Sequence, residues 1–502
     1  METATLVTFI VYLVGMLIIG LVAYKLTSNL SDYVLGGRST GPAVTALSAG
    51  ASDMSSWLLL GLPGLAYATG VSSIWMSVGL LIGAYVNWRI VAPRLRSYTE
   101  VADDAITIPD FLQSRFRDKS SLLRVVSALI ILVFFTFYVS SGLVAGAILF
   151  QESFGLDYMQ ALLIGAIVIV SYTFLGGYLA VSWTDFVQGL LMFLALVVVP
   201  IVTIVELGGW SEVTSQVGAV DPGYFDPFYN MTTIGIISLA AWGLGYFGQP
   251  HIIVRFMGIK SVKQIPAARR IGMSWMAISM AGAVLVGFIG IAYFAGDPLI
   301  AGDMDNSEKV FILLSDVLFN PIVSGILLAA ILSAIMSTID SQLLVSSSAL
   351  AEDLYPVVRP NASQKELVWI GRIGVLVIAI VAILLAMGAQ NGETSVLDLV
   401  AYAWAGFGAA FGPAILLSLY WRGTNQWGIL AGLVVGSLVV FTWVDVASAI
   451  WAPAAKLYEI VPGFILSLLA IIIVSKLTGR PGEDIQNDFD RAVAYDPDAK
   501  TE

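Results

Sequence analysis

An acidic residue lies in the middle of an apolar stretch long enough to cross a lipid bilayer. Asp53 sits in ALSAGASDMSSWLLLGLPG, residues 46–64, where glycines frame a serine-rich segment. A carboxylate at mid-membrane costs roughly 2.5–3.5 kcal/mol on insertion scales, so it needs a partner. Neither this stretch nor the glycine-rich AAWGLGYFGQPH, residues 240–251, contains a Lys or Arg that would neutralise it. The partner is therefore either a bound cation or the N-terminus of a half-helix that Ser52 and Asp53 would cap.

Hydroxyl groups gather near the end of a second apolar stretch, ILSAIMSTIDSQLLVSSS at residues 331–348. Three of them fall on adjacent helical turns, Ser337, Thr338 and Ser341. Ala334 precedes them, and Asp340 lies among them. Single hydroxyls in membrane helices commonly bond to their own backbone, but a cluster with a carboxylate also offers the oxygen ligands that hard cations take. Because the chain has no Cys and one His, a soft transition metal is disfavoured, and sodium suits such oxygens.

Other polar and aromatic residues occur at membrane depth. Asp185, in SWTDFVQ, either caps the helix that it opens or provides a charged ligand near the cytoplasmic side. Arg38, in DYVLGGRS, is interpreted first as a charge that sets orientation and second as a gate. His251 follows Pro250 and is interpreted as a local hydrogen-bonding residue. Three aromatic residues near the glycine-rich segments could wall a compact, partly apolar pocket: Tyr138, Trp242 and Tyr246.

The composition indicates that these segments lie in a membrane. Of 502 residues, 58% are apolar and 12% charged, and the mean hydropathy is +0.88. A soluble domain carries about 25% charged residues. The absence of Cys excludes disulfide scaffolds and iron–sulfur clusters. A net charge of −11 argues against nucleic acid, whose binding needs a basic patch. The chain is predicted to be an all-α, polytopic membrane protein.

Thirteen stretches reach the length of about 20 apolar residues that a span needs. They are 4–24, 41–67, 71–92, 122–150, 158–180, 184–206, 231–253, 271–295, 318–350, 367–388, 396–421, 427–447 and 458–476. With the N-terminus outside, 22 of the 24 Lys and Arg residues, Arg255 included, fall in inner loops or the C-terminal tail. Because Lys and Arg favour cytoplasmic loops, we predict an outer N-terminus and a cytoplasmic C-terminus.

The two glycine-rich stretches lie five spans apart, and both are predicted to be broken helices. Breaking a helix in lipid is costly unless the freed backbone groups find partners, and paired breaks mark the binding sites of transporters with repeats. Two repeats of five spans have opposite topologies, so we predict inverted repeats over 41–206 and 231–421. Residues 1–40 and 422–478 would be peripheral, within one transmembrane domain, 1–478. The tail, 479–502, is polar without an apolar period and is expected to be disordered.

The motifs resemble those of the sodium/solute symporter family, and more narrowly its bacterial sodium/proline symporters. The resemblance runs over essentially all thirteen spans. It is carried by LGGRS at 35–39, ALSAGASDMSSWLLLGLPG at 46–64, SWTDFVQ at 182–188, WGLGYFGQPHI at 242–252, MSTIDSQLLVSSSALAEDLY at 336–355 and AYAWAGFGAAFGP at 401–413. It implies a leucine-transporter-type core, a place in the bacterial inner membrane and uptake of L-proline driven by co-transported sodium, with no organic cofactor.

The same resemblance implies roles for individual residues. The main sodium site would use the carbonyls of Ala51, Met54 and Ala334 and the hydroxyls of Ser337 and Thr338, with Asp53 needed for sodium affinity. A second sodium site would map to Asp185, Ser337, Asp340 and Ser341. The proline site would involve Ser55, Ser56, Tyr138, Trp242, Tyr246 and Pro250, and Arg38 is a gating candidate.

Alternative functions make different demands on the sequence. A sodium-coupled carrier of the same fold for pantothenate, a monocarboxylate or a sugar is opposed only by the aromatic residues and the Ser55 region. A channel needs a continuous polar pore, whereas the polar residues here cluster in three spans. A sensor is also less favoured. An enzyme would need a nucleophile–base pair at this depth, and the sequence contains none, so we predict a transporter.

Overall fold

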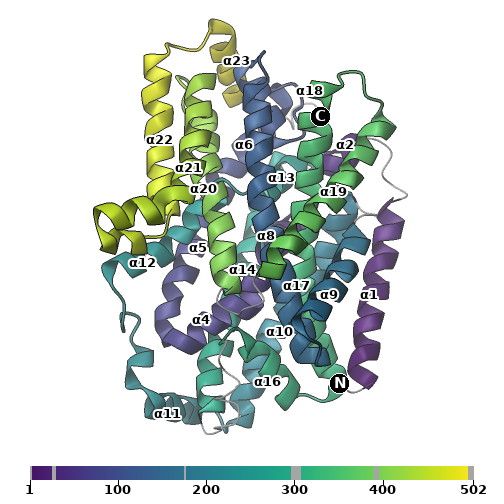
Figure 1. The fold of residues 1–502 in the computed structure, drawn as a ribbon, viewed down its shortest axis with the longest axis vertical. Helices are drawn as coiled ribbons and strands as arrows, with labels where there is room; N and C mark the ends of the chain where they lie inside the picture. The colour runs from purple at the N-terminus through teal and green to yellow at the C-terminus, as the bar shows by residue number, and fades with distance from the viewer. Residues whose placement is uncertain (1–2, 25–29, 174–176, 296–306, 389–394, 496–502) are drawn as a thin grey trace.

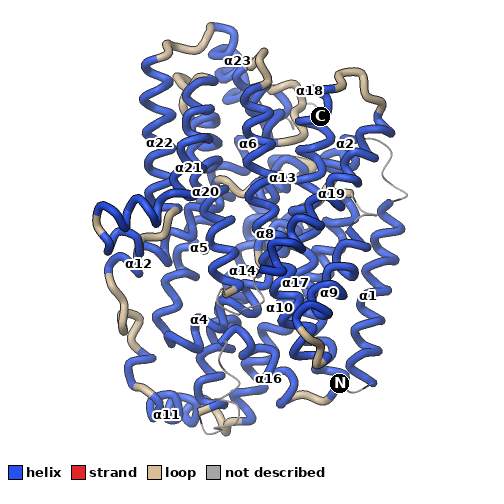
Figure 2. The backbone as a smooth tube through the Cα atoms, in the orientation of Figure 1, coloured by secondary structure: helices blue, strands red, loops and turns tan. Residues whose placement is uncertain are grey.

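The computed structural model describes residues 3–24, 30–173, 177–295, 307–388 and 395–495, and in these residues the regular structure is helical (Figures 1 and 2). Most helices run along the long axis of the molecule (Figure 1). Helix α1 (Thr3–Tyr24) lies along one edge, and α21 (Gln426–Ile450) and α22 (Ile460–Leu477) lie along the opposite edge. The fold class predicted from composition is thus confirmed.

In the first half of the chain, one break and several short turns divide the helices. They are α2 (Leu30–Leu35), η1 (Gly36–Arg38), α3 (Pro42–Asp53), η2 (Trp57–Gly61), α4 (Leu62–Thr69), η3 (Gly70–Ser73), α5 (Ile74–Val86), η4 (Asn87–Val91), α6 (Ala92–Val101), α7 (Ile108–Phe116), α8 (Leu122–Phe154), α9 (Tyr158–Thr173), α10 (Tyr178–Glu206), α11 (Trp210–Val220) and η5 (Pro222–Phe225).

The second half repeats this alternation of long and short elements. They are α12 (Thr233–Ala240), η6 (Ala241–Phe247), α13 (Pro250–Gly258), η7 (Val262–Gln264), α14 (Ile265–Phe294), η8 (Ser307–Lys309), α16 (Val310–Leu318), α17 (Pro321–Ser348), η9 (Ala349–Leu354), α18 (Tyr355–Val358), α19 (Gln364–Met387), α20 (Val396–Tyr420), η11 (Ala452–Lys456) and α23 (Glu483–Ala494).

Ten helical segments among the described residues are long and apolar enough to cross a membrane. One of them, Trp57–Val101, covers parts of two predicted spans, because Gly70 turns the chain between α4 and α5 with a φ of +65°. Two further predicted spans fall on shorter apolar helices, Tyr158–Val170 and Thr233–Phe247. The number of thirteen crossings therefore stays a prediction, as do the repeat boundaries 41–206 and 231–421.

Both predicted breaks are present. Helix α3 ends at Asp53, and Met54 follows with ψ of 78°, outside the helical range, before the chain coils again in η2. In the second glycine-rich stretch, α12 passes into the tighter turns of η6, and Gln249 is extended before Pro250 begins α13. Pro at the first helical position is favourable because its missing N–H would have no partner there. The glycine-rich composition of 46–64 and 240–251 thus predicted both discontinuities correctly.

Helix α17 occupies the centre of the molecule. In its most apolar window 83% of residues are buried, against 22% in α1. It begins at Pro321 after Asn320, whose side chain accepts two backbone N–H groups and caps the helix. It packs against α1, α3, α8, α10 and α19. The hydroxyl cluster of the sequence therefore lies on the innermost helix, next to the break in α3.

The second broken segment is held against α5 by glycines. A Cβ atom added to Gly79 or Gly83 would collide with the backbone of Ala240 or Gly243. Side chains at these positions would push η6 away from α5, so backbone contact between the two elements depends on hydrogen in place of Cβ. This close approach fixes where the unwound segment lies.

The C-terminal tail is not disordered throughout, which corrects the prediction for 479–502. Residues Glu483–Ala494 form α23, which packs on α6 and α7. Ile485, Phe489 and Ala492 recur at helical spacing, and the latter two are buried. Asp488 pairs with Arg117 at 2.6 Å. Three apolar residues among many charges are too weak a pattern to predict this helix from the sequence alone. Residues 496–502 lie outside the described part of the chain.

The close contact at α5 gives a stability prediction. Gly83→Ala should destabilise the folded protein by about 1–3 kcal/mol, the usual cost of overpacking, because the new methyl group would meet the backbone of Gly243. The apparent unfolding temperature of the purified protein in detergent measures this. Gly15→Ala in α1 is the matched control, since a Cβ there meets nothing within 4 Å. Equal effects of the two substitutions would contradict the contact.

Candidate functional site

The break in α3 frees the carbonyl oxygen of Ala51. In an unbroken helix this oxygen would accept the N–H of Ser55, but that N–H donates to the Asp53 carbonyl at 3.0 Å instead. Helix α17 packs against this part of α3. Its Ser337 hydroxyl donates to the Ala51 carbonyl oxygen at 2.8 Å, and its Thr338 hydroxyl donates to the same oxygen at 3.4 Å. Three of the predicted sodium ligands are therefore gathered at one point between α3 and α17.

The two remaining predicted ligands lie beside this point. The Ala334 carbonyl accepts the Ser337 hydroxyl at 3.2 Å, so it faces the same oxygen cluster. The Met54 carbonyl loses its helical donor as well, because the Leu58 N–H donates to Ser55 at 3.0 Å. Both Ala51 and Met54 are completely buried. The cluster consists of neutral oxygens, the ligand type that suits an alkali ion.

Asp53 is buried next to the break and is held by the second broken segment. Its Oδ2 accepts a hydrogen bond of 2.5 Å from the hydroxyl of Tyr246 in η6. Its backbone carbonyl accepts from the indole nitrogen of Trp57 at 3.0 Å. Within the described part of the chain, no donor reaches Oδ1. The carboxylate is therefore only half satisfied, which leaves one oxygen for a ligand.

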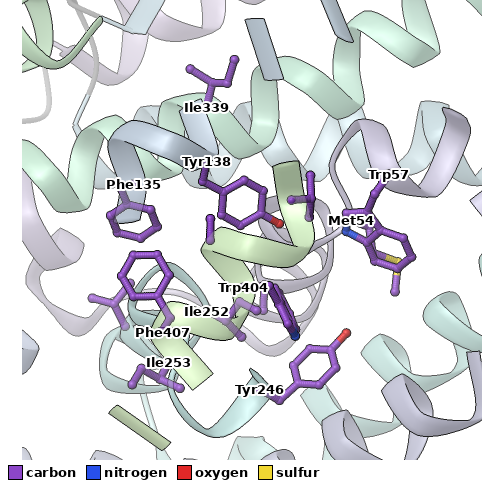
Figure 3. Packing of buried hydrophobic residues seen from close by; sticks show 14 of the residues in the cluster. Met54, Trp57, Phe135, Tyr138, Tyr246, Ile252, Ile253, Ile339, Trp404 and Phe407 are labelled. Carbon is purple, nitrogen blue, oxygen red and sulfur yellow. The ribbon is translucent and has the colours of Figure 1, made fainter. Parts of the chain in front are cut away.

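Aromatic rings from three elements lie close to the two breaks, and Figure 3 shows Trp57, Tyr246 and Trp404 among them. Trp404 of α20 meets Tyr246 edge-on at 5.2 Å and stacks on Trp242 at 6.3 Å. Trp242 also faces Trp57 at 6.3 Å. The Trp404 indole nitrogen donates to the Trp242 carbonyl at 2.8 Å, which ties α20 to the unwound segment. In the view of Figure 3, Trp404 lies between Tyr246 and Tyr138, whose hydroxyl has no partner among the described residues.

The other predicted substrate residues lie on both sides of these rings. Ser55 and Ser56 are buried in the break itself, and no described residue contacts the Ser56 hydroxyl by a hydrogen bond. Pro250 begins α13 and lines a small cavity with Val254 and Val345. Tyr138 is linked to this region through His251, which its ring meets edge-on at 5.9 Å. The six residues thus surround the two breaks, and their role as a binding site stays a prediction.

Close to the Ala51 cluster, a buried arginine contacts residues that were predicted to form a second sodium site. Arg255 of α13 lies 3.4 Å from Oδ2 of Asp185 and donates to the Ser341 hydroxyl at 2.6 Å. Ser48 and Ser52 also donate to this carboxylate oxygen, at 2.7 and 3.0 Å. Helix α10 begins at Tyr178, so Asp185 lies inside it and does not cap it, which corrects that interpretation. Asp340 contacts the group through Ser341, at 3.4 Å.

Arg38 lies at the opposite end of the molecule from the start of α1 and joins three segments. Its guanidinium pairs with Asp104 at 2.9 Å and donates to Thr99 of α6 and to the Met257 carbonyl of α13. Burial, with a contribution from nearby Arg96, lowers the pKa of Arg38, and Asp104 opposes this shift. The contacts close the end of α13 against α6, while the gating role stays a prediction.

The sequence missed three residues that shape the site. Arg255 was assigned to a cytoplasmic loop, but α13 continues to Gly258 and its side chain is completely buried. The sequence does contain an indication of this burial, because Arg255 lies inside the apolar run PHIIVRFMG. Trp57 and Trp404 were not separated from the other tryptophans, because only the tertiary contacts single out rings that face the broken segments.

The chain belongs to the sodium:solute symporter family, whose model matches residues 33–436. Among curated proteins, it is 54% identical to the osmoregulated proline transporter OpuE of Bacillus subtilis, over 96% of each chain. It is 55% identical to the high-affinity proline transporter PutP of the same organism, over 94% of this chain and 98% of that one. It is 52% identical to the sodium/proline symporter of Escherichia coli, over 98% and 97%.

A solved structure shows the same fold. The outward-open, substrate-bound structure of a Na+-coupled sialic acid symporter matches with a TM-score of 0.80 at 19% identity, over 96% of this chain and 99% of that chain. The nucleobase-cation-symport-1 transporter MHP1 matches with a TM-score of 0.55 at 16% identity, over 92% and 99%. At these identities the likeness shows the fold alone.

The oxygen cluster gives a direct prediction. Ser337→Ala should raise the sodium concentration that half-maximally stabilises the purified protein against heat by about 10–100-fold, because a lost contact to a charge costs about 1.5–3 kcal/mol. Bound sodium raises the unfolding temperature by mass action. The control is Ser437→Ala, whose hydroxyl bonds to Leu433 of its own helix. A normal sodium response in Ser337→Ala would remove Ser337 from the site.

Proposed function

We propose that the chain is a secondary active transporter that carries L-proline into the cell together with sodium, by alternating access. One observation supports the proposal most strongly. The break in α3 leaves the Ala51 carbonyl without its helical donor, and the hydroxyls of Ser337 and Thr338 in α17 contact it instead. Family membership supports the sodium coupling. The names of the three curated relatives support proline as the solute.

The main sodium ion would lie between α3 and α17. Its ligands would be the carbonyls of Ala51, Met54 and Ala334 with two α17 hydroxyls, whose hydrogens would turn away from the ion. Asp53, a few residues along the same break, would raise sodium affinity by its charge, directly or through the backbone that it orders. Because the ligands come from two separate elements, the ion would hold α3 against α17.

Proline would bind beside the break, among the aromatic residues. Its carboxylate would meet the Ser55 and Ser56 region and freed backbone groups, and its ring would pack on Tyr138, Trp242 and Tyr246, near Pro250. The same chemistry would favour proline over pantothenate, a monocarboxylate or a sugar, since a compact apolar ring would fit closely spaced aromatic side chains. Trp57 and Trp404 would belong to the same wall.

Sodium and proline binding would be coupled because both depend on an ordered backbone at the break in α3. Sodium bound at the Ala51 cluster would fix the unwound stretch of α3, so proline would bind to a segment that is already ordered. By linkage, proline then strengthens sodium binding by the same factor. Each sodium ion that enters the cell gains about 2.3 kcal/mol per 100 mV of membrane potential. Sodium and proline would be released into the cytoplasm when the cytoplasmic ends of the helices separate. This step would require the contacts of Arg38 with α6 and α13 to break, so that α13 can move away from α6.

The proposed orientation has the N-terminus outside and the C-terminus in the cytoplasm, in the bacterial inner membrane. Helix α1 begins at one end of the long axis, and α23 lies at the other (Figure 1). Opposite ends require an odd number of crossings, in agreement with thirteen. The excess of Lys and Arg in the loops on the α23 side supports its cytoplasmic location.

Uptake of labelled L-proline by proteoliposomes tests the proposal. Transport should require an inward sodium gradient and should fall to background when potassium replaces sodium, because the proposed coupling ion is sodium. Asp53→Asn should lower the apparent sodium affinity at least about tenfold, through the loss of about 1.4 kcal/mol or more. Unlabelled pantothenate, lactate and glucose should compete weakly. The proposal would be rejected if uptake were equally fast in potassium. It would also be rejected if unlabelled proline did not inhibit uptake while another solute did.

Because the chain has no native cysteine, single introduced cysteines can test the orientation. Ser215→Cys in α11 and Asn361→Cys between α18 and α19 are exposed positions, and α11 and α18 lie at opposite ends of the molecule (Figure 1). In intact cells, a membrane-impermeant maleimide should label Ser215→Cys and should reach Asn361→Cys only after permeabilisation. The reverse pattern would invert the proposed orientation without affecting the transport function.

A further inference from the structure

A cavity of about 430 Å³ lies at the end of the molecule where α23 packs on α6 and α7. Figure 1 shows α23 beside α6 at this end. Four cationic side chains line the cavity, from α7, the turn that follows it, and α23: Arg115, Arg117, Lys119 and Arg491. A cavity of this volume is typical of small-molecule sites, which range from about 300 to 1,000 Å³. It is separate from the sodium cluster and from both helix breaks.

Arg115 is the buried cation of this cavity. The residue is 1% exposed, and its Nε donates to the Ser418 carbonyl at 3.2 Å. Neither of its Nη atoms has a hydrogen-bond partner among the described residues. Because a buried charge is costly unless its hydrogen-bonding groups are satisfied, these two nitrogens are available for a ligand.

The neighbours of Arg115 compensate its charge only in part. The rings of Tyr98, Phe116 and Phe489 lie around the guanidinium, with centroids 5.2, 4.7 and 5.2 Å from its Cζ atom. Cation–π contacts of this kind stabilise the charge, but they supply no acceptor for the N–H groups of the guanidinium plane. Burial lowers the pKa of Arg115, and Tyr98 and Asp488 oppose that shift. An anion in the cavity would complete the compensation.

Two more polar groups of the cavity lack partners within the part of the chain that the structure describes. They are the hydroxyl of Tyr98 in α6, which is 2% exposed, and the Oε1 atom of Gln113 in α7. A guanidinium and a phenol together donate to an oxyanion, and the planar donors of arginine match phosphate oxygens well. The free amide oxygen of Gln113 would accept a hydrogen bond from a hydroxyl group of the same ligand.

The carboxylates that line the cavity do not supply this anion. Asp488 is paired with Arg117 at 2.6 Å and lies 3.4 Å from Arg491. Asp118 accepts two backbone N–H groups of the following turn, each at 2.9 Å. Asp103 is exposed to solvent. The buried guanidinium is therefore left without an internal counter-charge.

We infer that this cavity binds a phosphate ester through the Nη atoms of Arg115 and the hydroxyl of Tyr98. A hydroxyl group of the ester would donate to Gln113, and the exposed Lys119 would attract the anion. Because Phe489 of α23 forms part of the wall, the bound ester would hold α23 against α6 and α7. Two sources can supply this chemistry: the glycerophosphate headgroup of an anionic phospholipid, or a soluble phosphate ester. The inference goes beyond the proposed function, since neither sodium nor proline takes part.

Thermal unfolding of the full-length protein in detergent tests the inference, at constant sodium concentration and constant ionic strength. The probes are glycerol 3-phosphate and short-chain phosphatidylglycerol, with glycerol and short-chain phosphatidylcholine as their controls. A phosphate ester that binds only the folded protein should raise the unfolding temperature by mass action. A rise with glycerol 3-phosphate would identify a soluble ester, and a rise with phosphatidylglycerol alone would identify a lipid headgroup. No rise with either probe would overturn the inference.

Three variants, titrated with whichever ester is effective, assign the binding to this cavity. Arg115→Gln should weaken binding about 10–100-fold, the effect of losing hydrogen bonds from a charged group. Tyr98→Phe removes a hydroxyl that has no described partner, so it should weaken binding about 3–10-fold and leave the unfolding temperature of the free protein unchanged. Arg359→Gln removes an exposed arginine that is paired with Glu366 at the surface, and it should bind as the wild type does.

Wild-type affinity in both Arg115→Gln and Tyr98→Phe would place the ester elsewhere and overturn the inference. If Arg115→Gln does not fold, Tyr98→Phe decides the matter, because the phenylalanine ring retains the edge-on contacts with Phe111 and Phe489. A purely structural role of Arg115 predicts a change in the unfolding temperature of the free protein without any response to the ester. Proline uptake does not enter these measurements, so their failure would leave the proposed function intact.

Discussion

Inside a lipid bilayer a backbone carbonyl that leaves its helix must find another partner, and at Ala51 that partner is the central helix α17. The break after Asp53 removes the helical donor, and Ser337 and Thr338 supply hydroxyls in its place. The unbonded alternative would cost several kcal/mol in hydrocarbon. The same requirement that makes a broken helix expensive therefore places an oxygen cluster at its breaking point.

The second break depends on close backbone contact. Gly79 and Gly83 let the backbone of η6 lie directly on α5, and Trp404 and Gln249 then join η6 to α20 through hydrogen bonds of 2.8 and 3.0 Å. Tyr246, carried by this segment, reaches across to Asp53. The Asp53 carboxylate thus connects the two unwound segments, so ordering one segment also restrains the other.

The two buried carboxylates of the site have different partners. Asp53 of α3 accepts a hydrogen bond from the Tyr246 hydroxyl of η6, whereas Asp185 of α10 lies beside the guanidinium of Arg255. Ion pairs also join the ends of helices, such as Arg38 with Asp104 and Arg117 with Asp488, and one partner in each pair is exposed to solvent. Ion pairs at the surface contribute about 0–1 kcal/mol each, so these pairs position the ends of helices more than they stabilise the fold.

Several features followed from the sequence by itself. Apolar length predicted the helical membrane class, and glycine and proline clusters predicted both breaks, because the backbone there needs room or lacks a donor. The hydroxyl spacing in 331–348 predicted that Ser337, Thr338 and Ser341 lie on adjacent turns of one helix, and the motifs indicated the family. Each of these signals is local, so it can be recognised without knowing which helices touch.

Only the tertiary structure decided which groups meet. Arg255 looked like a loop charge because span ends are uncertain by a few residues, and its partner Asp185 lies 70 positions away. Trp57 and Trp404 were indistinguishable from other tryptophans until packing brought them to η6. Helix α23 was overlooked because its short apolar stripe has meaning only against α6 and α7. Contacts between distant segments depend on packing of whole helices, and local composition carries no record of that packing.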